Sequence, residues 1–463
     1  MPVLHQLGAH ELLAAYRSRS LSPVDVLTDV LAHIAACEPL LNATYAVDAA
    51  RAMDAARASE VRWQRGEPVG LLDGVPALLK ENIATAGVPT PLGCAATELR
   101  AAPADAPPAA RLREAGAVIL GKTTMPDLGM LSSGLSSFHP LTRNPWNLQR
   151  TPGGSSAGAA TAAAAGYGPL QVGTDIGGSI RLPAGWCGVF GLKPSHGRVP
   201  IGAPYPARVA GPITRSVRDA ALMMAVLSQP DWRDHMSLPP ERIDWMSLGR
   251  ELRGLRIGLM LDAGWGLAPQ AEVTAAITAA AHAFEDAGAI VEPLAPFANR
   301  EMADGIDRFW RTRAWIDLQA FDAPQRRRVL PFIAAWAEGG ATLSGADLMR
   351  HYHQTLAMRA ATVAACQPFD FVLSPVAAVP AFAAELPCPT NDPARPFEHI
   401  AFTVPFSMSE QPAASINAGY TAEGLPIGLQ IAGRRFDDLG VLQMAWAWEQ
   451  MRPAQHPWPM SLP

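Results

Sequence analysis

The chain has 463 residues, of which 49% are hydrophobic and 17% are charged. A chain of this length suits two or three average domains or one large α/β domain, and its composition is not that of a disordered protein. Its formal net charge of −5 does not provide the basic surface that a general nucleic-acid-binding protein needs. These values predict a folded globular protein and exclude nucleic acid as the expected partner.

No segment of the sequence predicts export or membrane insertion. No apolar run approaches the ~20 residues of a membrane span, and the N-terminal residues lack the basic start and apolar core of a secretory leader. The cysteines are scattered and form no CxxC pair; they are Cys37, Cys94, Cys187, Cys366 and Cys388. This pattern predicts a reducing, cytoplasmic location and no membrane partner.

In chain order, residues 22–64 predict two helices. Ser22, Pro23 and Asp25 match an N-cap, a first helical position and a capping box. Short apolar runs typical of buried strands follow, and helical stretches separate them. The predicted strands are 74–79, 117–120, 169–173 and 255–261, and the predicted helices are 105–115, 155–166 and 216–227.

The polar, proline-containing segment 229–245 is the best candidate for an internal boundary. The elements predicted beyond it are a helix at 270–287, a mostly helical segment at 297–366, a helix near 437–451, and strands at 289–294, 369–376, 413–419 and 425–433. Strands that alternate with helices favour an α/β sandwich around a largely parallel sheet. The helical segment carries aromatic residues that suit either core packing or the wall of an apolar substrate pocket: Phe309, Trp310, Trp315, Phe321, Phe332 and Trp336.

Two short motif matches fail on physical grounds. Residues 116–123, GAVILGKT, satisfy the P-loop pattern, but their central residues are the predicted strand itself and not a flexible phosphate-binding loop. Residues 154–158, GSSAG, satisfy the nucleophile-elbow pattern around Ser156, but a polar loop precedes them where a buried strand is required. His351 and His353 fall on different faces of a predicted helix. We therefore predict no nucleotide or other cofactor, no metal ion and no Ser-His-Asp triad.

Two Gly-Gly-Ser clusters, at 153–156 and 177–179, flank a nearly pure Ala/Gly segment. With GVPALLKENIATAGVPT (74–90) and GTDIGGSIRLPAGWCGVFGLKP (173–194), they resemble the amidase signature family of hydrolases. The resemblance covers roughly residues 5–450 and is strongest at 74–224. The other segments that resemble the family, in the same order along the chain, are GKTTMPDLG (121–129), LTRNPWN (141–147), GPITRSVRDAALMM (211–224) and GLPIGLQIAGRRFDD (424–438).

The resemblance implies one domain spanning residues 1–463. Its expected fold is an α/β/α sandwich whose large mixed, mostly parallel central sheet is covered by helices. The signature core lies at about 74–224, and the mostly helical segment at about 297–366 is expected to contribute the substrate pocket. Members of the family often form homodimers, so a homodimer is the expected assembly.

Enzymes similar to this chain use a Ser-Ser-Lys relay. Matched motif to motif, Ser179 is the implied nucleophile, Ser155 the bridging serine after a cis peptide bond at Gly154–Ser155, and Lys80 the base. A lysine removes the proton of a serine only when its own pKa falls from about 10.4 towards ~7–8. The apolar run before Lys80 suits a desolvated position that lowers the pKa. One departure from the family pattern is Ala157, where a glycine is common.

The resemblance also implies an oxyanion hole, made of the backbone N–H groups of Ile176, Gly177, Gly178 and Ser179. We interpret Asp175 and Arg181, which flank this loop, as an ion pair that holds it in place. Ser156 is expected to hydrogen-bond neighbouring backbone and not to react. The Ala/Gly segment is expected to be a buried helix that packs closely enough to bring the two serine clusters together.

The sequence therefore predicts a metal-free amidase that cleaves the C–N bond of a small amide. The aromatic content and modest charge favour an uncharged, apolar or aryl substrate. The same acyl-enzyme chemistry suits a carbamate or an ester, so a urethanase-like hydrolase is one alternative. Another is the glutaminase subunit of a tRNA-dependent amidotransferase, for which residues 297–450 offer no recognisable pairing of Arg with Asp. A third alternative, an inactive binding protein, is disfavoured by the intact set of Lys80, Ser155 and Ser179.

Overall fold

The computed structural model describes residues 3–460, which are built around one eleven-stranded sheet. Residues 1–2 and 461–463, the ends of the predicted 1–463 domain, lie outside the described residues. The strand order is β1-β3-β2-β4-β6-β5-β10-β11-β9-β7-β8. The strands are β1 (Thr44–Tyr45), β2 (Pro76–Lys80), β3 (Val118–Thr123), β4 (Leu170–Asp175), β5 (Phe190–Lys193), β6 (Val209–Thr214), β7 (Arg256–Leu259), β8 (Ile290–Pro293), β9 (Phe371–Pro375), β10 (Ala413–Tyr420) and β11 (Pro426–Gly433).

Helices cover both faces of this sheet. On one face, α7 (Val217–Leu227) packs on β6 and contacts α4 (Pro107–Glu114) and α14 (Asp438–Met451), and α8 (Ala271–Asp286) continues this layer. On the other face, α5 (Ala157–Ala165) packs on β4, and α6 (Arg181–Trp186) packs on β10 and β11. The predicted α/β fold class with a large mixed sheet is thus confirmed.

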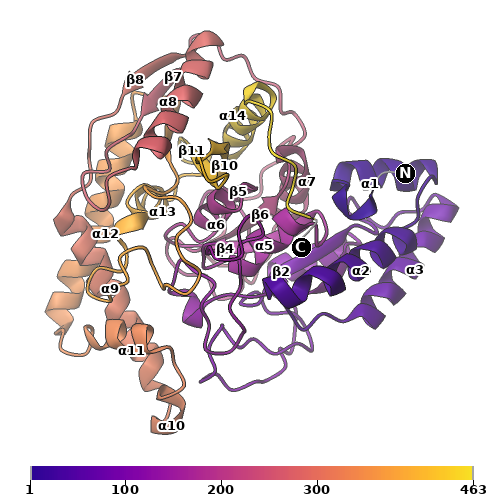
Figure 1. Ribbon diagram of the computed structural model, residues 1–463, viewed down its shortest axis with the longest axis horizontal. Helices are drawn as coiled ribbons and strands as arrows, with labels where there is room; N and C mark the ends of the chain where they lie inside the picture. The colour runs from indigo at the N-terminus through magenta and orange to yellow at the C-terminus, as the bar shows by residue number, and fades with distance from the viewer. Residues whose placement is uncertain (1–2, 461–463) are drawn as a thin grey trace.

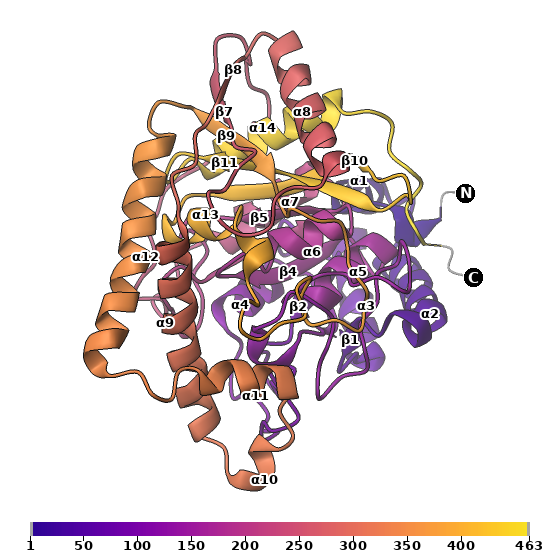
Figure 2. The same ribbon diagram turned by 60° about the vertical axis from the view of Figure 1, so that its left-hand side comes forward.

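Two helical groups flank the sheet on opposite sides of the molecule (Figures 1 and 2). One group is N-terminal: α1 (Ala9–Ser18), α2 (Pro23–Leu41) and α3 (Ala49–Arg65). The other group comprises α9 (Arg300–Gln319), α10 (Ala323–Arg326), α11 (Pro331–Glu338) and α12 (Gly345–Cys366), which confirms the mostly helical character predicted for 297–366. The short helices are η1 (Leu4–Gln6), η2 (Asp127–Gly129), η3 (Glu398–Ile400) and α13 (Val404–Met408).

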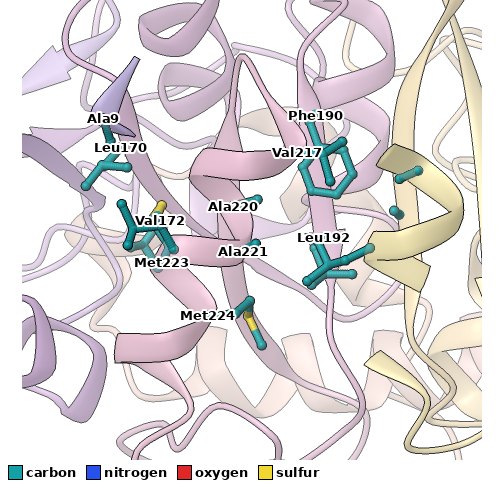
Figure 3. Packing of buried hydrophobic residues seen from close by; sticks show 14 of the residues in the cluster. Ala9, Leu170, Val172, Phe190, Leu192, Val217, Ala220, Ala221, Met223 and Met224 are labelled. Carbon is teal, nitrogen blue, oxygen red and sulfur yellow. The ribbon is translucent and has the colours of Figure 1, made fainter. Parts of the chain in front are cut away.

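The core beneath α7 shows how the sequence pattern specifies the packing. Side chains of a strand alternate between its two faces, so Leu170 and Val172 of β4 point to the same side as α7, as do Phe190 and Leu192 of β5. Figure 3 shows these residues packed against the apolar face of α7, which is formed by Val217, Ala220, Ala221, Met223 and Met224. All of them are buried. The central strands of the sheet are therefore well packed against α7 on this face. The serine clusters lie on the opposite face.

The predicted capping box of the first long helix is confirmed. Asp25 N donates to Ser22 Oγ (3.1 Å), and Ser22 N donates to the Asp25 carboxylate (3.2 Å), with Pro23 as the first residue of α2. Every strand predicted from an apolar run overlaps a strand of the sheet. Residues 229–245 contain no helix or strand, as expected of a connection. They do not separate two sheets, however, because β7 beyond them pairs with β9 of the same sheet.

The sheet departs from the expectation in its proportion of parallel strands. Within residues 3–460, four neighbouring pairs are parallel (β2–β3, β2–β4, β7–β8 and β7–β9), and the other six are antiparallel. Five of the antiparallel pairs occupy the centre, where β10 and β11 form a hairpin and β6 returns beside both β4 and β5, and the sixth, β1–β3, lies at one edge. Short returns of this kind produce antiparallel neighbours, whereas parallel neighbours need a longer crossover. In the described part of the chain, no helix is both long enough and apolar enough to cross a lipid bilayer.

Candidate active site

Lys80 lies at the carboxyl end of β2, a strand whose five residues are all buried between β3 and β4. Its ammonium Nζ donates to Ser155 Oγ (2.8 Å) and to Ser156 Oγ (3.1 Å). Burial lowers the pKa of Lys80 to about 7, and the charges of Asp175 and Glu81 oppose that shift only in part. Near neutral pH a substantial fraction of this amine is therefore uncharged, which a general base requires.

The acidic neighbours of Lys80 have other side chains as partners. The carboxylate of Glu81, the next residue along the chain, lies 2.7 Å from Nε2 of His139. Asp175 lies 3.0 Å from the Arg181 guanidinium, and both of these side chains are fully buried. Lys80 thus makes its hydrogen bonds to serine hydroxyls, which do not hold it in the charged form as a paired carboxylate would.

Ser155 lies between the Lys80 amine and a cavity. The peptide bond Gly154–Ser155 is cis. A Cβ on Gly154 would lie 2.7 Å from both the carbonyl oxygen of Leu131 and the amide nitrogen of Ser133, so only glycine fits there. Ser155 is 3% exposed and lines the cavity described below. Its hydroxyl therefore contacts the buried amine and also faces the space where a substrate can enter.

The Ala/Gly segment forms α5, and all nine of its residues are buried, as predicted. It packs so closely that a Cβ on Gly158 would lie 2.1 Å from the carbonyl oxygen of Ala43. Just before this helix, Ser156 N donates to the carbonyl oxygen of Ser179 (3.1 Å), which ties the two serine clusters together. Ser156 Oγ also donates to the carbonyl oxygen of Thr174 (3.2 Å) and accepts from its N–H (3.3 Å).

The loop that carries Ser179 connects β4 to α6 and is held by a buried ion pair. Asp175 accepts from the backbone N–H groups of Gly178 (2.8 Å) and Ile180 (3.1 Å) and from Arg181 Nε (3.0 Å). The other guanidinium nitrogens of Arg181 donate to elements from the C-terminal half of the chain, namely to Thr403 O, Gln430 Oε1 and Ser407 Oγ. The Asp175–Arg181 pair thus fixes the backbone of the loop from both sides.

Of the four backbone N–H groups proposed for the oxyanion hole, one is already hydrogen-bonded within the loop and three are not. The Gly178 N–H is already used by Asp175. The N–H groups of Ile176, Gly177 and Ser179 meet no acceptor within residues 3–460. Gly178 has a φ of 128°, a conformation that glycine adopts readily. The expected set of four donors is therefore reduced to three amides that are free to receive a negatively charged oxygen.

Ser155 and Ser179 line one cavity of about 420 Å³. Its outer wall comes from α9 and the residue pair after it, through Arg313, Asp317, Ala320 and Phe321, and from Arg208 in the loop before β6. A narrow apolar branch of about 40 Å³ also reaches Ser179. The side chains that line this branch include Leu131, Leu182, Trp310, Phe397 and Ile400.

Some aromatic residues of 297–366 line the cavity, and others pack in the core. Phe321 lines the larger cavity and Trp310 lines the apolar branch, whereas Trp336 is fully buried in the core of the helical group. The sequence interpretation missed the charged members of the cavity, Arg208 and Arg313, because no local motif marks them. Lys122, the penultimate residue of β3, is buried and donates to the carbonyl oxygen of Ile83 and to Thr85 Oγ1.

Comparison with known proteins gives a consistent result. A family model described as Amidase matches residues 25–442. The chain is 35% identical to a subunit of the glutamyl-tRNA(Gln) amidotransferase of Desulforapulum autotrophicum, across 97% of this chain and 98% of that protein. Among solved structures, it resembles a bacterial aryl acylamidase of the amidase signature family (TM-score 0.90, 32% identity, 100% of both chains). It also resembles 6-aminohexanoate cyclic dimer hydrolase (TM-score 0.87, 26% identity, 99% of this chain and 100% of that one).

Proposed function

Because the chain belongs to the amidase signature family, we propose that it hydrolyses a small amide through a covalent acyl-enzyme on Ser179. The observation that carries this proposal is the 2.8 Å hydrogen bond between the buried Lys80 amine and Ser155, whose side chain lines the same cavity as Ser179. A buried lysine with its pKa lowered to about 7 is a competent base near neutral pH.

In the proposed reaction, Ser179 Oγ attacks the amide carbonyl carbon. Its proton passes to Ser155 Oγ as the Ser155 proton passes to the Lys80 amine, so the lysine becomes charged. The relay then returns a proton to the amide nitrogen, the C–N bond breaks, and the amine leaves. Water attacks the acyl-enzyme by the same route and releases the acid together with free Ser179.

The free amides of Ile176, Gly177 and Ser179 support the proposal at the step where charge develops. Each is available to donate to the oxygen of the tetrahedral intermediate, and donors fixed in advance need no reorganisation during the reaction. The Asp175–Arg181 pair holds these amides in place through the loop backbone. In other enzymes, removal of one such donor costs about 3–4 kcal/mol in the barrier.

The apolar branch beside Ser179 suits an apolar or aryl group next to the scissile bond. Carbamates and esters react by the same acyl-enzyme steps, so a urethanase-like activity is a variant of the same proposal. A panel of aryl amides, short aliphatic amides, carbamates and esters, ranked by kcat/KM, separates these substrates. A homodimer, a cytoplasmic location and the absence of a metal cofactor stay predictions from the sequence.

A second candidate function, glutaminase within a tRNA-dependent amidotransferase, is favoured by two observations. Curated relatives carry the name of one of the subunits of that enzyme. Arg313 and Asp317, one turn apart on α9, both line the cavity with Ser179, so a cation and an anion are available to the two charges of a free amino acid. Ammonia release from L-glutamine, measured against hydrolysis of aryl amides by the same preparation, decides between the two functions.

The decisive experiment replaces the nucleophile. Ser179→Ala should abolish both amide turnover and covalent labelling by a fluorophosphonate, because Ser179 supplies the attacking oxygen in the proposed reaction. Ser156→Ala is the matched control: it tests the serine of the false elbow motif and should keep labelling at Ser179, as peptide mass spectrometry can verify. Labelling that survives in Ser179→Ala would refute the assignment.

A further inference from the structure

Two arginines of the cavity donate no hydrogen bond to the residues of the proposed relay. Arg208, in the loop before β6, and Arg313, in α9, come from segments far apart in the sequence and line the same cavity as Ser155 and Ser179. Both guanidinium groups lie over the ring of Tyr205, at 5.5 Å for Arg208 and 4.4 Å for Arg313. The ring thus holds two like charges near each other, an arrangement that is unfavourable unless an anion joins them.

Neither arginine is neutralised by the protein. In the described part of the chain, no carboxylate oxygen lies within 4.0 Å of the guanidinium nitrogens of Arg208 or Arg313, which is the distance limit of an ion pair. The buried Arg181 and Arg198, in contrast, each form an ion pair with a carboxylate. The hydrogen bond that Arg208 donates from Nη1 to the carbonyl oxygen of Ala203 is a long one (3.3 Å). A guanidinium group has five N–H donors, so most of the donors of this pair stay available to a ligand.

The acidic residues of the cavity do not cancel this charge. Asp175 is fully engaged with Arg181 and the loop amides. Asp317 is the other acidic residue in the lining, and it interacts with both arginines only at long range. Two cations therefore face one available anion, which leaves a net positive wall opposite the serines.

We propose that the substrate carries a carboxylate, which the guanidinium groups of Arg208 and Arg313 bind while Ser179 attacks the amide. The proposal rests on the amide hydrolase function given above and names its substrate class. Arginine binds carboxylates through paired, parallel N–H···O bonds, and such charge-assisted bonds are stronger than neutral ones. A second cation in reach of the same anion strengthens the attraction further.

The two branches of the cavity give this substrate a direction. Arg313 borders both branches, whereas Arg208 lines only the larger one. The branch at Leu182, Trp310 and Ile400 receives the apolar or aryl part, and the arginines at the wall of the larger cavity receive the carboxylate. The cavity of about 420 Å³ falls in the range of small-molecule sites, which span about 300–1,000 Å³. The expectation of an uncharged substrate is thereby replaced by an amide that is apolar at one end and anionic at the other.

Matched substrate pairs test the proposal in the intact enzyme. One pair is 4-carbamoylbenzoate and 4-methylbenzamide, with the carboxylate on the acyl side; the other is 4-acetamidobenzoate and 4-methylacetanilide, with the carboxylate on the amine side. We expect a preference of about 10- to 100-fold in kcat/KM for the carboxylate in at least one pair, which is the range of a hydrogen bond to a charged group. Equal kcat/KM values within both pairs would overturn the proposal.

Charge-removing variants then assign the preference to these side chains. Arg208→Gln and Arg313→Gln should each reduce the carboxylate preference to about fivefold or less, mainly through a higher KM, since each removes one of the two cations. The matched control is Arg308→Gln on the same helix; Arg308 is exposed and lies outside the cavity, so its variant should keep the wild-type preference. Loss of the preference in Arg308→Gln to the same extent would show a long-range charge effect and overturn the assignment.

The outcomes separate this proposal from the function on which it rests. If Ser179→Ala still hydrolyses the amides, the proposed function fails. If Ser179→Ala is inactive and the wild-type enzyme hydrolyses the neutral member of each pair as well as the anionic one, the function stands and carboxylate binding fails. Urea titrations of both arginine variants verify that they are folded, so that a lost preference for the anionic substrate is not a loss of structure.

Discussion

Lys80 is one of only three lysines in the sequence, with Lys122 and Lys193, and all three are buried. Burial lowers the pKa of each to about 7. A lowered pKa therefore does not single out the base. What distinguishes Lys80 is contact: Lys122 donates to the carbonyl of Ile83 and to Thr85, and Lys193 donates to the carbonyl of Pro194, whereas Lys80 donates to a serine that faces the cavity.

The pH dependence of the reaction follows from the same residue. The relay needs the uncharged amine, so kcat/KM should be level above pH 8 and fall about tenfold per pH unit below the Lys80 pKa of about 7. The rate of fluorophosphonate labelling should follow the same curve, because the labelling step also needs the proton of Ser179 removed. The residual labelling of Lys80→Met should lose this acid limb, and a limb that persists there with the same midpoint would contradict the assignment.

The midpoint of the acid limb of this pH–rate profile should shift in a known direction when a charge near Lys80 is removed. The negative charge of Asp175 raises the pKa of Lys80, against the larger effect of burial. In Asp175→Asn that charge is absent, so the pKa of Lys80 should fall and the acid limb should move to lower pH. The stability of the variant should also fall, by about 3–5 kcal/mol, because Arg181 is left as a buried, unpaired charge. A pH–rate profile and a urea titration measure the two effects separately, and a limb that moves to higher pH would contradict the first.

At the scale of elements, α5 sets the distance between the two serine clusters. Its side chains are methyl groups or smaller apart from Thr161, and this lets the helix approach the loop at Ala43 and the end of β3 closely. The approach is closest at Gly158, where a Cβ would lie 2.5 Å from the amide nitrogen of Thr124. A larger residue here would move the helix and, with it, the serine that precedes it.

Gly158→Ala tests this role of α5. The added methyl group would overpack the contact, so we expect a loss of about 1–3 kcal/mol in the free energy of unfolding and a lower kcat. Gly345→Ala is the matched control, because Gly345 starts α12 and a Cβ there meets nothing within 4 Å. Its free energy of unfolding should change by less than about 1 kcal/mol. Urea titrations of both variants measure the difference, and equal effects would contradict the close-packing argument.

The sequence predicts elements well where hydrophobic pattern alone determines them. Strands β2, β3 and β4 each overlap a short, mostly apolar run and are predicted from it, as is the capping box of α2. Three strands escape prediction: β1 has only two residues, β5 contains Gly191, and β6 contains Gly211 and Pro212. Glycine and proline favour turns in a local interpretation, and only pairing with β4 and β5 extends these residues into strands.

The residues of the candidate site also differ in how far the sequence alone predicts them. Ser155 and Ser179 lie in local sequence motifs, so the family resemblance identifies them. Lys80 is identified in the same way, because it ends an apolar run in another of these motifs. Arg208 and Arg313 carry no motif of their own. They come together only because α9 lies beside the loop before β6 in the folded chain, and this tertiary contact cannot be predicted from either segment alone.

At the scale of the whole molecule, the site lies where the sheet ends and the helical group begins. Lys80 is the last residue of β2, and the Ser179 loop follows β4. These two strands are parallel neighbours, so their carboxyl ends meet at one edge of the sheet. Helix α9 closes this edge with Arg313 and Asp317. Catalytic groups thus come from the rigid sheet layer, and substrate contacts come from a helical group on the outside, visible at the far side from α1–α3 in Figure 2.

Burying an amine to make it a base should reduce the stability of the whole molecule. Folding lowers the pKa of Lys80 from 10.5 to about 7, so between these values the unfolded chain binds more protons and this contribution to stability increases with pH. Lys80→Met removes the contribution. Relative to the wild-type enzyme, the variant should therefore be most stable near pH 7 and should lose that advantage towards pH 9, by at most about 1.4 kcal/mol per pH unit. Urea titrations at both pH values measure the difference. Ser179→Ala, which removes activity but keeps the buried amine, is the control, and its stability relative to the wild-type enzyme should not change with pH. An advantage that grows from pH 7 to pH 9 would show that the amine at position 80 is not held uncharged by its surroundings.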